Sequence, residues 1–387
     1  MTEQKHAVMT DEMINEFHDK YIGKVWKPRQ PYFNTQATRD TIRHFVDGIG
    51  DDNPLFRDAE YAKKSEYGCI PAPPCFIFSV WWPGRAIGLP GIHGWDSGKD
   101  FRFYLPMLEG DTIDYEVTYV SLKERPSKTV GRVWMQHSDN VYINQRGENI
   151  IYCDGWTTRA ERASAGAKKA NIVRKADVLP GRDFSGILAA YDAEVIRGAE
   201  PRYWEDVKEG DLLQPVVKGP LTVRDMITWL MGAGSPYMRA HKIFYDFQRR
   251  HTATGMIDTT TGQVDAPELV HMEASRAQEI GIGDAYDYGH ERMSWMGNLL
   301  TNWMGDNGFI KKFYAMFRRF NMVGDTTWLM GKVIKKYIDE EGEPVVDIEC
   351  WGENQRGEVT MPGSATIALP SREKKTSPVL KRMEGRK

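Results

Sequence analysis

The sequence predicts an α+β protein made of two tandem domains, each an antiparallel sheet wrapped around a central helix. Short motifs recur along the chain at a nearly constant spacing, which indicates a duplicated domain. Within each copy a long apolar helical stretch is followed by a series of alternating, β-branched segments. A chain of 387 residues with 41% hydrophobic residues can supply a core to both copies.

The repeat is clearest around a short helix that occurs in both copies. Residues 56–68 are echoed at 271–283, with matching alanines and a matching glycine, so the spacing is 271 − 56 = 215. The first copy has Phe56 at the start of this helix, whereas the second copy has His271. Only the second copy therefore carries a proton-transferring side chain there.

A second pair of motifs locates an insertion in the second copy. Thr38-Arg39-Asp40 is echoed by Val223-Arg224-Asp225, at a spacing of 225 − 40 = 185. The two spacings differ by 215 − 185 = 30 residues, which places an insertion between Ser235 and Val270, near 236–266. The aromatic residues of this insertion include Tyr237, and we expect it to cover the active site as a lid.

Local signals place the remaining elements in chain order. In the first copy we expect helices near 13–21 and 38–46, a long buried helix at 75–87, and strands at 100–105, 114–122, 129–142 and 149–158. A helix is expected at 186–197, before the second copy begins; in the second copy we expect a helix at 289–304 and strands at 309–320, 326–338, 345–354 and 358–369. The resulting domains are 1–160 and 201–372, with an exposed linker at 161–200 and a basic, solvated tail at 373–387.

Charge and composition exclude several classes of protein. The net charge of −3 leaves no basic footprint for nucleic acid, and no apolar run reaches the ~18–20 residues of a membrane span. The four cysteines have neither disulfide nor metal-ligand spacing. We therefore expect a cytoplasmic protein with reduced thiols, no metal, no nucleic-acid partner and no membrane association.

Two sets of motifs together resemble the MaoC-like double-hotdog dehydratases and hydratases, which include (R)-specific enoyl-CoA hydratases and the FAS1-type dehydratase N-terminal domain. The first set is Gly50-Asp51-Asp52-Asn53-Pro54-Leu55, followed by Ala72-Pro73-Pro74; the second is His271-Met272-Glu273, followed by Gly324-Asp325-Thr326. The resemblance implies two tandem hotdog domains that reversibly add water to a 2-enoyl thioester. It also implies an acyl-CoA ligand, no cofactor beyond coenzyme A as part of the substrate, and a homodimer.

The family's active-site pattern is Asp-x-Asn-Pro-x-His, and neither copy keeps all of it. The first copy matches at Asp51 and Asn53 but has Phe56 in place of histidine, so these three residues are expected to form a substrate-binding wall. The second copy keeps His271 and has Ala266 or Ser235 at the aspartate place, depending on the spacing used. Asp265, six residues before His271, is taken as the candidate acid.

The resemblance and the chemistry of hydration together give the remaining site residues. His271 is expected to be the acid/base, assisted by Asp265, and the N–H of Gly289 at the start of the second long helix is expected to bind the thioester oxygen. Tyr237, Tyr286, His290 and Arg292 are expected to bind substrate.

Two other functions stay open at this stage. One is a non-catalytic acyl-CoA-binding subunit that completes a partner's site. The other is a hotdog thioesterase, which would use a carboxylate on the long helix such as Glu291. A carboxylate within hydrogen-bond reach of His271 would favour the hydro-lyase, and the absence of any would favour the binding subunit.

Overall fold

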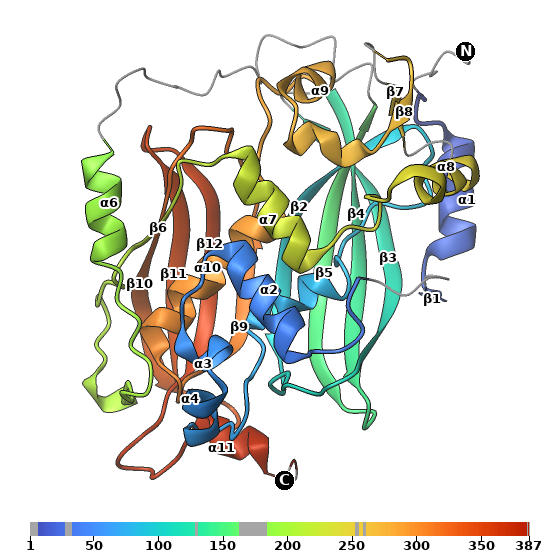
Figure 1. The fold of residues 1–387 in the computed structure, drawn as a ribbon. Helices are drawn as coiled ribbons and strands as arrows, with labels where there is room; N and C mark the ends of the chain where they lie inside the picture. The colour runs from blue at the N-terminus through green and yellow to red at the C-terminus, as the bar shows by residue number, and fades with distance from the viewer. Residues whose placement is uncertain are drawn as a thin grey trace.

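The computed structural model describes residues 7–27, 33–127, 131–161, 184–251, 255–257, 261–384 and 386. Within these residues one ten-stranded antiparallel sheet runs through both copies, in the order β1-β3-β4-β5-β2-β9-β12-β11-β10-β6 (Figure 1). Its strands are β1 (Val25–Trp26), β2 (Ile92–Phe103), β3 (Ile113–Ser127), β4 (Gly131–Asn144), β5 (Asn149–Glu161), β6 (Val216–Lys218), β9 (Phe309–Met316), β10 (Thr327–Ile338), β11 (Pro344–Asn354) and β12 (Val359–Ala368). The two copies join edge to edge where β2 pairs with β9, with Phe101 opposite Phe313.

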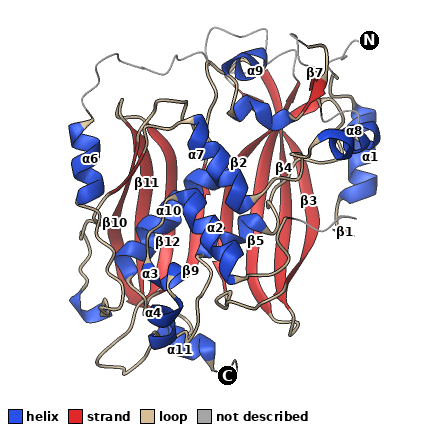
Figure 2. Cartoon of the chain, in the orientation of Figure 1, coloured by secondary structure: helices blue, strands red, loops and turns tan. Residues whose placement is uncertain are grey.

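The helices lie mainly on one face of this sheet and at its ends (Figure 2). The α-helices are α1 (Asp11–Tyr21), α2 (Arg39–Ile49), α3 (Pro54–Arg57), α4 (Ala59–Lys64), α6 (Ser185–Asp192), α7 (Val223–Ala233), α8 (His241–Arg250), α9 (Ala274–Glu279), α10 (Gly289–Met304) and α11 (Pro378–Met383). Three 3₁₀ turns are η1 (Pro74–Ser79), η2 (Trp204–Asp206) and η3 (Pro267–His271), and the short strands β7 (Met256–Ile257) and β8 (Val264–Asp265) pair with each other. No helix in these described ranges is both long enough and apolar enough to cross a bilayer.

Most of the predicted elements are confirmed. The four strands of each copy form as expected, with ends shifted by up to eight residues, the largest shift being at the start of β2, and part of the strand predicted at 129–142 lies outside the described residues. Helix α10 begins and ends at the predicted residues, and every residue from His290 to Met304 is buried. A helix buried all round is the central helix of a domain, here enclosed by the sheet of the second copy and by the first copy.

The long buried helix predicted at 75–87 is wrong. The chain forms only η1 and then continues as an irregular segment along the sheet. Gly84 explains this path: its φ is +74°, and a Cβ atom there would lie 2.7 Å from the backbone of Gly155 and Trp156. Trp81 fixes the same segment by donating a hydrogen bond from Nε1 to Asn140 Oδ1 over 3.1 Å. Within the described residues of the first copy, the segment 75–87 therefore forms no counterpart of α10.

The two copies also contact each other through an equivalent pair of helices, α2 and α7. Capping boxes at Thr38 and Thr222 fix the starts of these helices. A Cβ atom at Gly48 would lie 2.9 Å from the Thr228 carbonyl oxygen, and one at Gly232 would lie 2.4 Å from the His44 carbonyl oxygen. Glycine at both places therefore allows the backbones to touch, so the copies share one core.

The predicted solvated tail differs from the structure. Residues 378–383 form helix α11, which starts at the N-cap Ser377 with Pro378 as its first residue. Val379 is fully buried, and Arg382 donates two hydrogen bonds to Glu343, at 2.8 and 2.9 Å. Of the predicted linker, residues 162–183 lie outside the described residues, and α6 occupies part of the remainder.

Candidate active site

A cavity of about 780 Å³ is lined by residues of both copies. Its walls come from residues 82–86 and 93–97 of the first copy, and from η3, the start of α10 and residues 317–322 of the second copy. Pockets of ~300–1,000 Å³ accommodate ligands of drug or cofactor size. The cavity can therefore take an acyl group with part of its carrier.

His271 lies in the wall of this cavity at the end of η3. Its Nδ1 donates a hydrogen bond to the Tyr286 carbonyl oxygen over 2.8 Å, and its ring stacks on Tyr288 with 3.8 Å between ring centroids. Because Nδ1 carries the proton, Nε2 is left with a lone pair. Burial lowers the pKa of His271 to about 4. The imidazole is therefore neutral at physiological pH and able to accept a proton at Nε2.

Glu268 is the carboxyl group that the structure brings to the same wall. It lies three residues before His271 in η3, and side chains three residues apart in a 3₁₀ helix lie above one another. Only 4% of Glu268 is exposed, and burial raises its pKa to about 7. A carboxyl group thus lines the same cavity as His271 and keeps its proton to near neutral pH.

The expected assistant, Asp265, lies elsewhere. It belongs to β8, where it pairs with Met256, and its Oδ1 accepts a hydrogen bond from the N–H of Ala266 over 2.7 Å. It is absent from the cavity wall. The constant spacing of 215 had placed Glu268 at the asparagine position of the family pattern, so the three-residue separation from His271 was the signal that could have found it.

The two ends of the predicted insertion lie next to each other, because Ser235 contacts Glu268. The Ser235 hydroxyl donates a hydrogen bond to Glu268 Oε1 and accepts hydrogen bonds from the N–H groups of Tyr237 (3.0 Å) and Met238 (3.2 Å). Tyr237 lines the cavity and accepts a hydrogen bond from Arg85 Nε over 3.0 Å. The start of the insertion therefore forms part of the cavity wall.

The start of helix α10 supplies the second feature of the site. Gly289 is the first residue of α10 and lines the cavity, and first-turn N–H groups have no partner within the helix. A Cβ atom at Gly289 would lie 2.6 Å from the Phe317 ring, so glycine is required there. The positive end of the helix dipole and the Gly289 N–H make this a suitable place for a developing negative charge.

His290 and Arg292 both line the cavity, but their side chains differ in the hydrogen bonds that they make within the protein. Arg292 is held by Asp287, by the Arg319 carbonyl oxygen at 2.7 Å and by the Thr360 carbonyl oxygen at 3.4 Å, so it anchors the helix start. Burial lowers the pKa of His290 well below its usual value. Its Nε2 lies 3.1 Å from Asp96 Oδ2, without the alignment of a hydrogen bond.

The first-copy motif lies apart from His271. Asn53 and Phe56 line a separate cavity of about 50 Å³, too small for an acyl group, and Asp51 lines neither cavity. Asp51 Oδ1 accepts a hydrogen bond from the Asn53 N–H, and Asn53 Oδ1 accepts one from the Leu55 N–H, both over 3.0 Å. The motif therefore shapes the loop that starts α3, and the structure does not bring these residues to the large cavity.

The remaining predicted residue, Tyr286, lines the large cavity and orients His271 through its carbonyl oxygen. Glu291, the carboxylate that a thioesterase would use, is fully buried and is absent from the cavity wall. Its Oε2 accepts a hydrogen bond from the Tyr288 N–H over 3.4 Å. Glu291 therefore caps α10. Three exposed arginines, Arg125, Arg318 and Arg319, stand among the cavity-lining residues.

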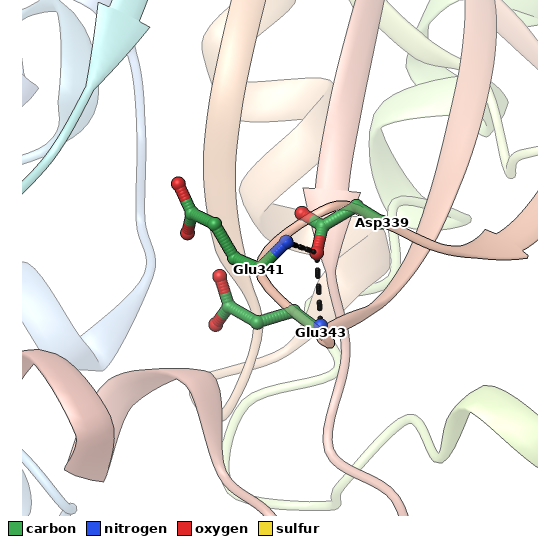
Figure 3. A group of neighbouring side chains, drawn as sticks. All are labelled: Asp339, Glu341 and Glu343. Carbon is green, nitrogen blue, oxygen red and sulfur yellow. Dashed lines mark hydrogen bonds between the residues drawn. The ribbon is translucent and has the colours of Figure 1, made fainter.

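A group of three acids elsewhere has metal-like spacing, namely Asp339, Glu341 and Glu343 (Figure 3). Asp339 Oδ1 accepts hydrogen bonds from the N–H groups of Glu341 and Glu343, at 3.0 and 2.9 Å. The Lys311 ammonium contacts all three carboxylates, 2.9 Å from Glu341 and 2.8 Å from Glu343. A lysine thus occupies the position that a cation would take, and the group ties β9 to the β10–β11 turn.

Comparisons with known proteins agree with this architecture. Residues 29–152 match the family model of the FAS1-like dehydratase domain region. The UPF0336 protein of Thermobifida fusca is 34% identical over 113 residues, which cover 27% of this chain and 70% of that protein. A UPF0336 protein of Parafrankia sp. is 31% identical over 157 residues, covering 38% of this chain and 94% of that protein.

Solved structures with the same fold include a MaoC-like dehydratase (TM-score 0.62, 15% identity, covering 91% of this chain and 99% of that one). Another is a putative MaoC domain dehydratase from Chloroflexus aurantiacus (TM-score 0.59, 14% identity, 92% and 98%). A third is a Mycobacterium tuberculosis protein with a double hotdog fold (TM-score 0.53, 11% identity, 93% and 99%).

The chain belongs to the family of the UPF0336 proteins. The expected resemblance to the MaoC-like proteins and the predicted α+β fold with two hotdog domains are confirmed. The match of residues 29–152 to the FAS1-like dehydratase region indicates dehydratase or hydratase chemistry in general.

Proposed function

We propose that the protein is a hydro-lyase that adds water to a 2-enoyl-CoA thioester, or removes it from a 3-hydroxyacyl-CoA, with His271 as the acid/base. The observation that carries this proposal is the position of His271. Its tautomer is set by the Tyr286 carbonyl oxygen, its Nε2 has a lone pair, and it shares the cavity wall with Gly289 at the start of α10.

The geometry supports two of the three tasks that hydration requires, the third being delivery of a proton to the α-carbon. The thioester oxygen would accept a hydrogen bond from the Gly289 N–H, where the dipole of α10 stabilises the charge of the enolate-like transition state. His271 Nε2 would take a proton from the attacking water as its oxygen bonds to the β-carbon. In the reverse direction the same nitrogen returns the proton to the leaving hydroxyl group.

The carrier of the acyl group is proposed to be coenzyme A. Arg125, Arg318 and Arg319 are exposed side chains of the cavity wall, and arginine binds phosphate in a bidentate manner. The proposed chemistry uses no metal and no further cofactor. Dimerisation of the whole chain and a cytoplasmic location stay predictions.

The presence of Glu268 favours catalysis over simple acyl-CoA binding. Burying an ionisable carboxyl group costs free energy, and a passive binding protein gains nothing from placing it in the wall of the ligand cavity. Among the described residues Glu268 makes no hydrogen bond to His271, so the support for catalysis comes from their shared cavity wall and not from a direct contact.

The test is turnover of short, branched and aromatic trans-2-enoyl-CoAs, followed by loss of the enoyl absorbance. His271→Ala should lower kcat/KM by roughly 10²–10⁴, the usual contribution of a general acid or base. His137→Ala is the matched control, because His137 pairs with Asp154 at 3.2 Å but does not line the cavity. Equal activity of wild type and His271→Ala, or no turnover of any thioester by the wild type, would contradict the proposal.

A further inference from the structure

We infer that Glu268 is the second catalytic group of this site, donating the proton that the α-carbon receives while His271 takes the proton from water. The inference rests on the proposed function and assigns a residue and a role within that site. The family pattern supplies an aspartate for the carboxyl role, but here Ser235 or Ala266 stands at that place and the glutamate stands at the asparagine place.

The geometry gives Glu268 access to the same substrate as His271. Both side chains come from one turn of η3, three residues apart, and both line the cavity. Tyr288, which stacks on the His271 ring, is close enough to Glu268 that the glutamate's charge helps to raise the pKa of Tyr288. His271, Tyr288 and Glu268 are therefore neighbours in one wall.

The two oxygens of Glu268 have different surroundings. Oε1 accepts the hydrogen bond from the Ser235 hydroxyl, which holds the carboxyl group in place. Oε2 is buried and has no hydrogen-bond partner among the described residues. Burying an unpaired carboxylate costs more than burying a neutral carboxyl group, which favours a proton on this oxygen, and the O–H then lacks an acceptor until a substrate enters the cavity. Oε2–H is therefore the proton donor.

The protonation states of the two groups fit opposite roles. Burial keeps His271 neutral by lowering its pKa to about 4, and it keeps Glu268 protonated by raising its pKa to about 7. The charged groups that act on Glu268 from other elements are Arg85 and Arg239, and both oppose this rise without cancelling it. Two titratable groups of one site whose pKa values are shifted in opposite directions are typical of a base and an acid.

The proton balance closes within this pair. One O–H bond of water breaks, its oxygen bonds to the β-carbon, and that proton goes to His271 Nε2. The Oε2–H bond of Glu268 breaks, and its proton forms the new bond at the α-carbon. The imidazolium then returns its proton to the Glu268 carboxylate, so one water molecule is added and both groups are restored.

The first experiment is the pH profile of kcat/KM for wild type and Glu268→Gln. The variant keeps the size of the side chain and an acceptor for Ser235, and it should lose roughly 10²–10⁴ in kcat/KM. The wild-type rate should fall above about pH 7, where Glu268 loses its proton, and the variant should lack this decline. A purely structural role for Glu268 would leave the decline in place.

Glu291→Gln is the matched control. Glu291 is also a buried glutamate, but it caps α10 and does not line the cavity, and glutamine can replace it in a capping box. This variant should keep the wild-type profile. If Glu268→Gln behaves like Glu291→Gln while His271→Ala is inactive, the inference fails and the proposed function stands.

A measurement that needs no turnover distinguishes failure of the Glu268 inference from failure of the proposed function. The infrared difference spectrum of wild type minus Glu268→Gln should show a protonated carboxyl band at about pH 6 that disappears by about pH 8. If the wild type turns over no thioester, the proposed function fails regardless of this spectrum. A carboxyl group that is already ionised at about pH 6 overturns the assignment of Glu268 as a proton donor.

Discussion

Glu268 makes a prediction about folding stability that is independent of activity. The pKa of its carboxyl group rises from 4.5 to about 7 in the folded protein, and only 4% of the residue is exposed. The folded state therefore binds this proton more tightly than the unfolded chain does, so its contribution to stability is fully present below about pH 4.5. That contribution is lost as the pH rises to about 7.

The size of the effect follows from the shift in pKa. Each pKa unit corresponds to about 1.4 kcal/mol, so the change from 4.5 to about 7 amounts to about 3 kcal/mol. Glu268→Gln removes the titration but keeps the shape of the side chain. Relative to wild type, the variant should gain about 3 kcal/mol of unfolding free energy between about pH 4.5 and about pH 8.

Urea unfolding at a series of pH values measures this difference directly, provided that the slope with denaturant stays constant. Glu273→Gln is the control, because the Glu273 side chain is 46% exposed and its replacement should give a small difference at every pH. The reasoning is refuted if the gap between wild type and Glu268→Gln is the same at about pH 5 and at about pH 8.

Two further predictions concern stability. Lys311→Met should cost about 3 kcal/mol in urea unfolding, because it leaves Glu343 and two neighbouring acids facing one another, whereas Lys381→Met, 48% exposed and 3.5 Å from Glu343, should cost under about 1 kcal/mol. Equal losses would show that Lys311 is not the centre of that group. Gly84→Ala should lower the melting temperature strongly, because its Cβ atom would lie 2.7 Å from backbone, while Gly23→Ala, with a similar φ of +71° and open space, should lose only about 1 kcal/mol. A matching loss at both glycines would mean that backbone strain alone decides the result.

Local patterns were sufficient for most of the fold. The strands follow from alternation and from turn residues, and α10 follows from its apolar length together with Gly289 at its start. The segment 75–87 has the same apolar character as α10, so composition alone could not separate a buried helix from an irregular buried segment. Pro83 and Gly84 were the signals against a helix there.

The candidate site was predictable only in part. His271 follows from the repeat and Gly289 from its place at the start of the predicted long helix, and the structure places both in the wall of the large cavity. The meeting of Ser235 with Glu268 depends on how an insertion of about 30 residues folds back, and no local pattern encodes that contact. The arginine at 292 shows the converse: its type suggested binding, but its partners lie within the protein.

The pairing of β2 with β9 places two unequal halves in one continuous sheet. In a symmetric assembly of two identical single domains, every substitution appears twice, so losing a central helix would remove it from both domains. A fused chain escapes this symmetry. One half could give up its helix while the other kept α10 and His271, and a change that would destroy a symmetric ancestor can survive in this chain.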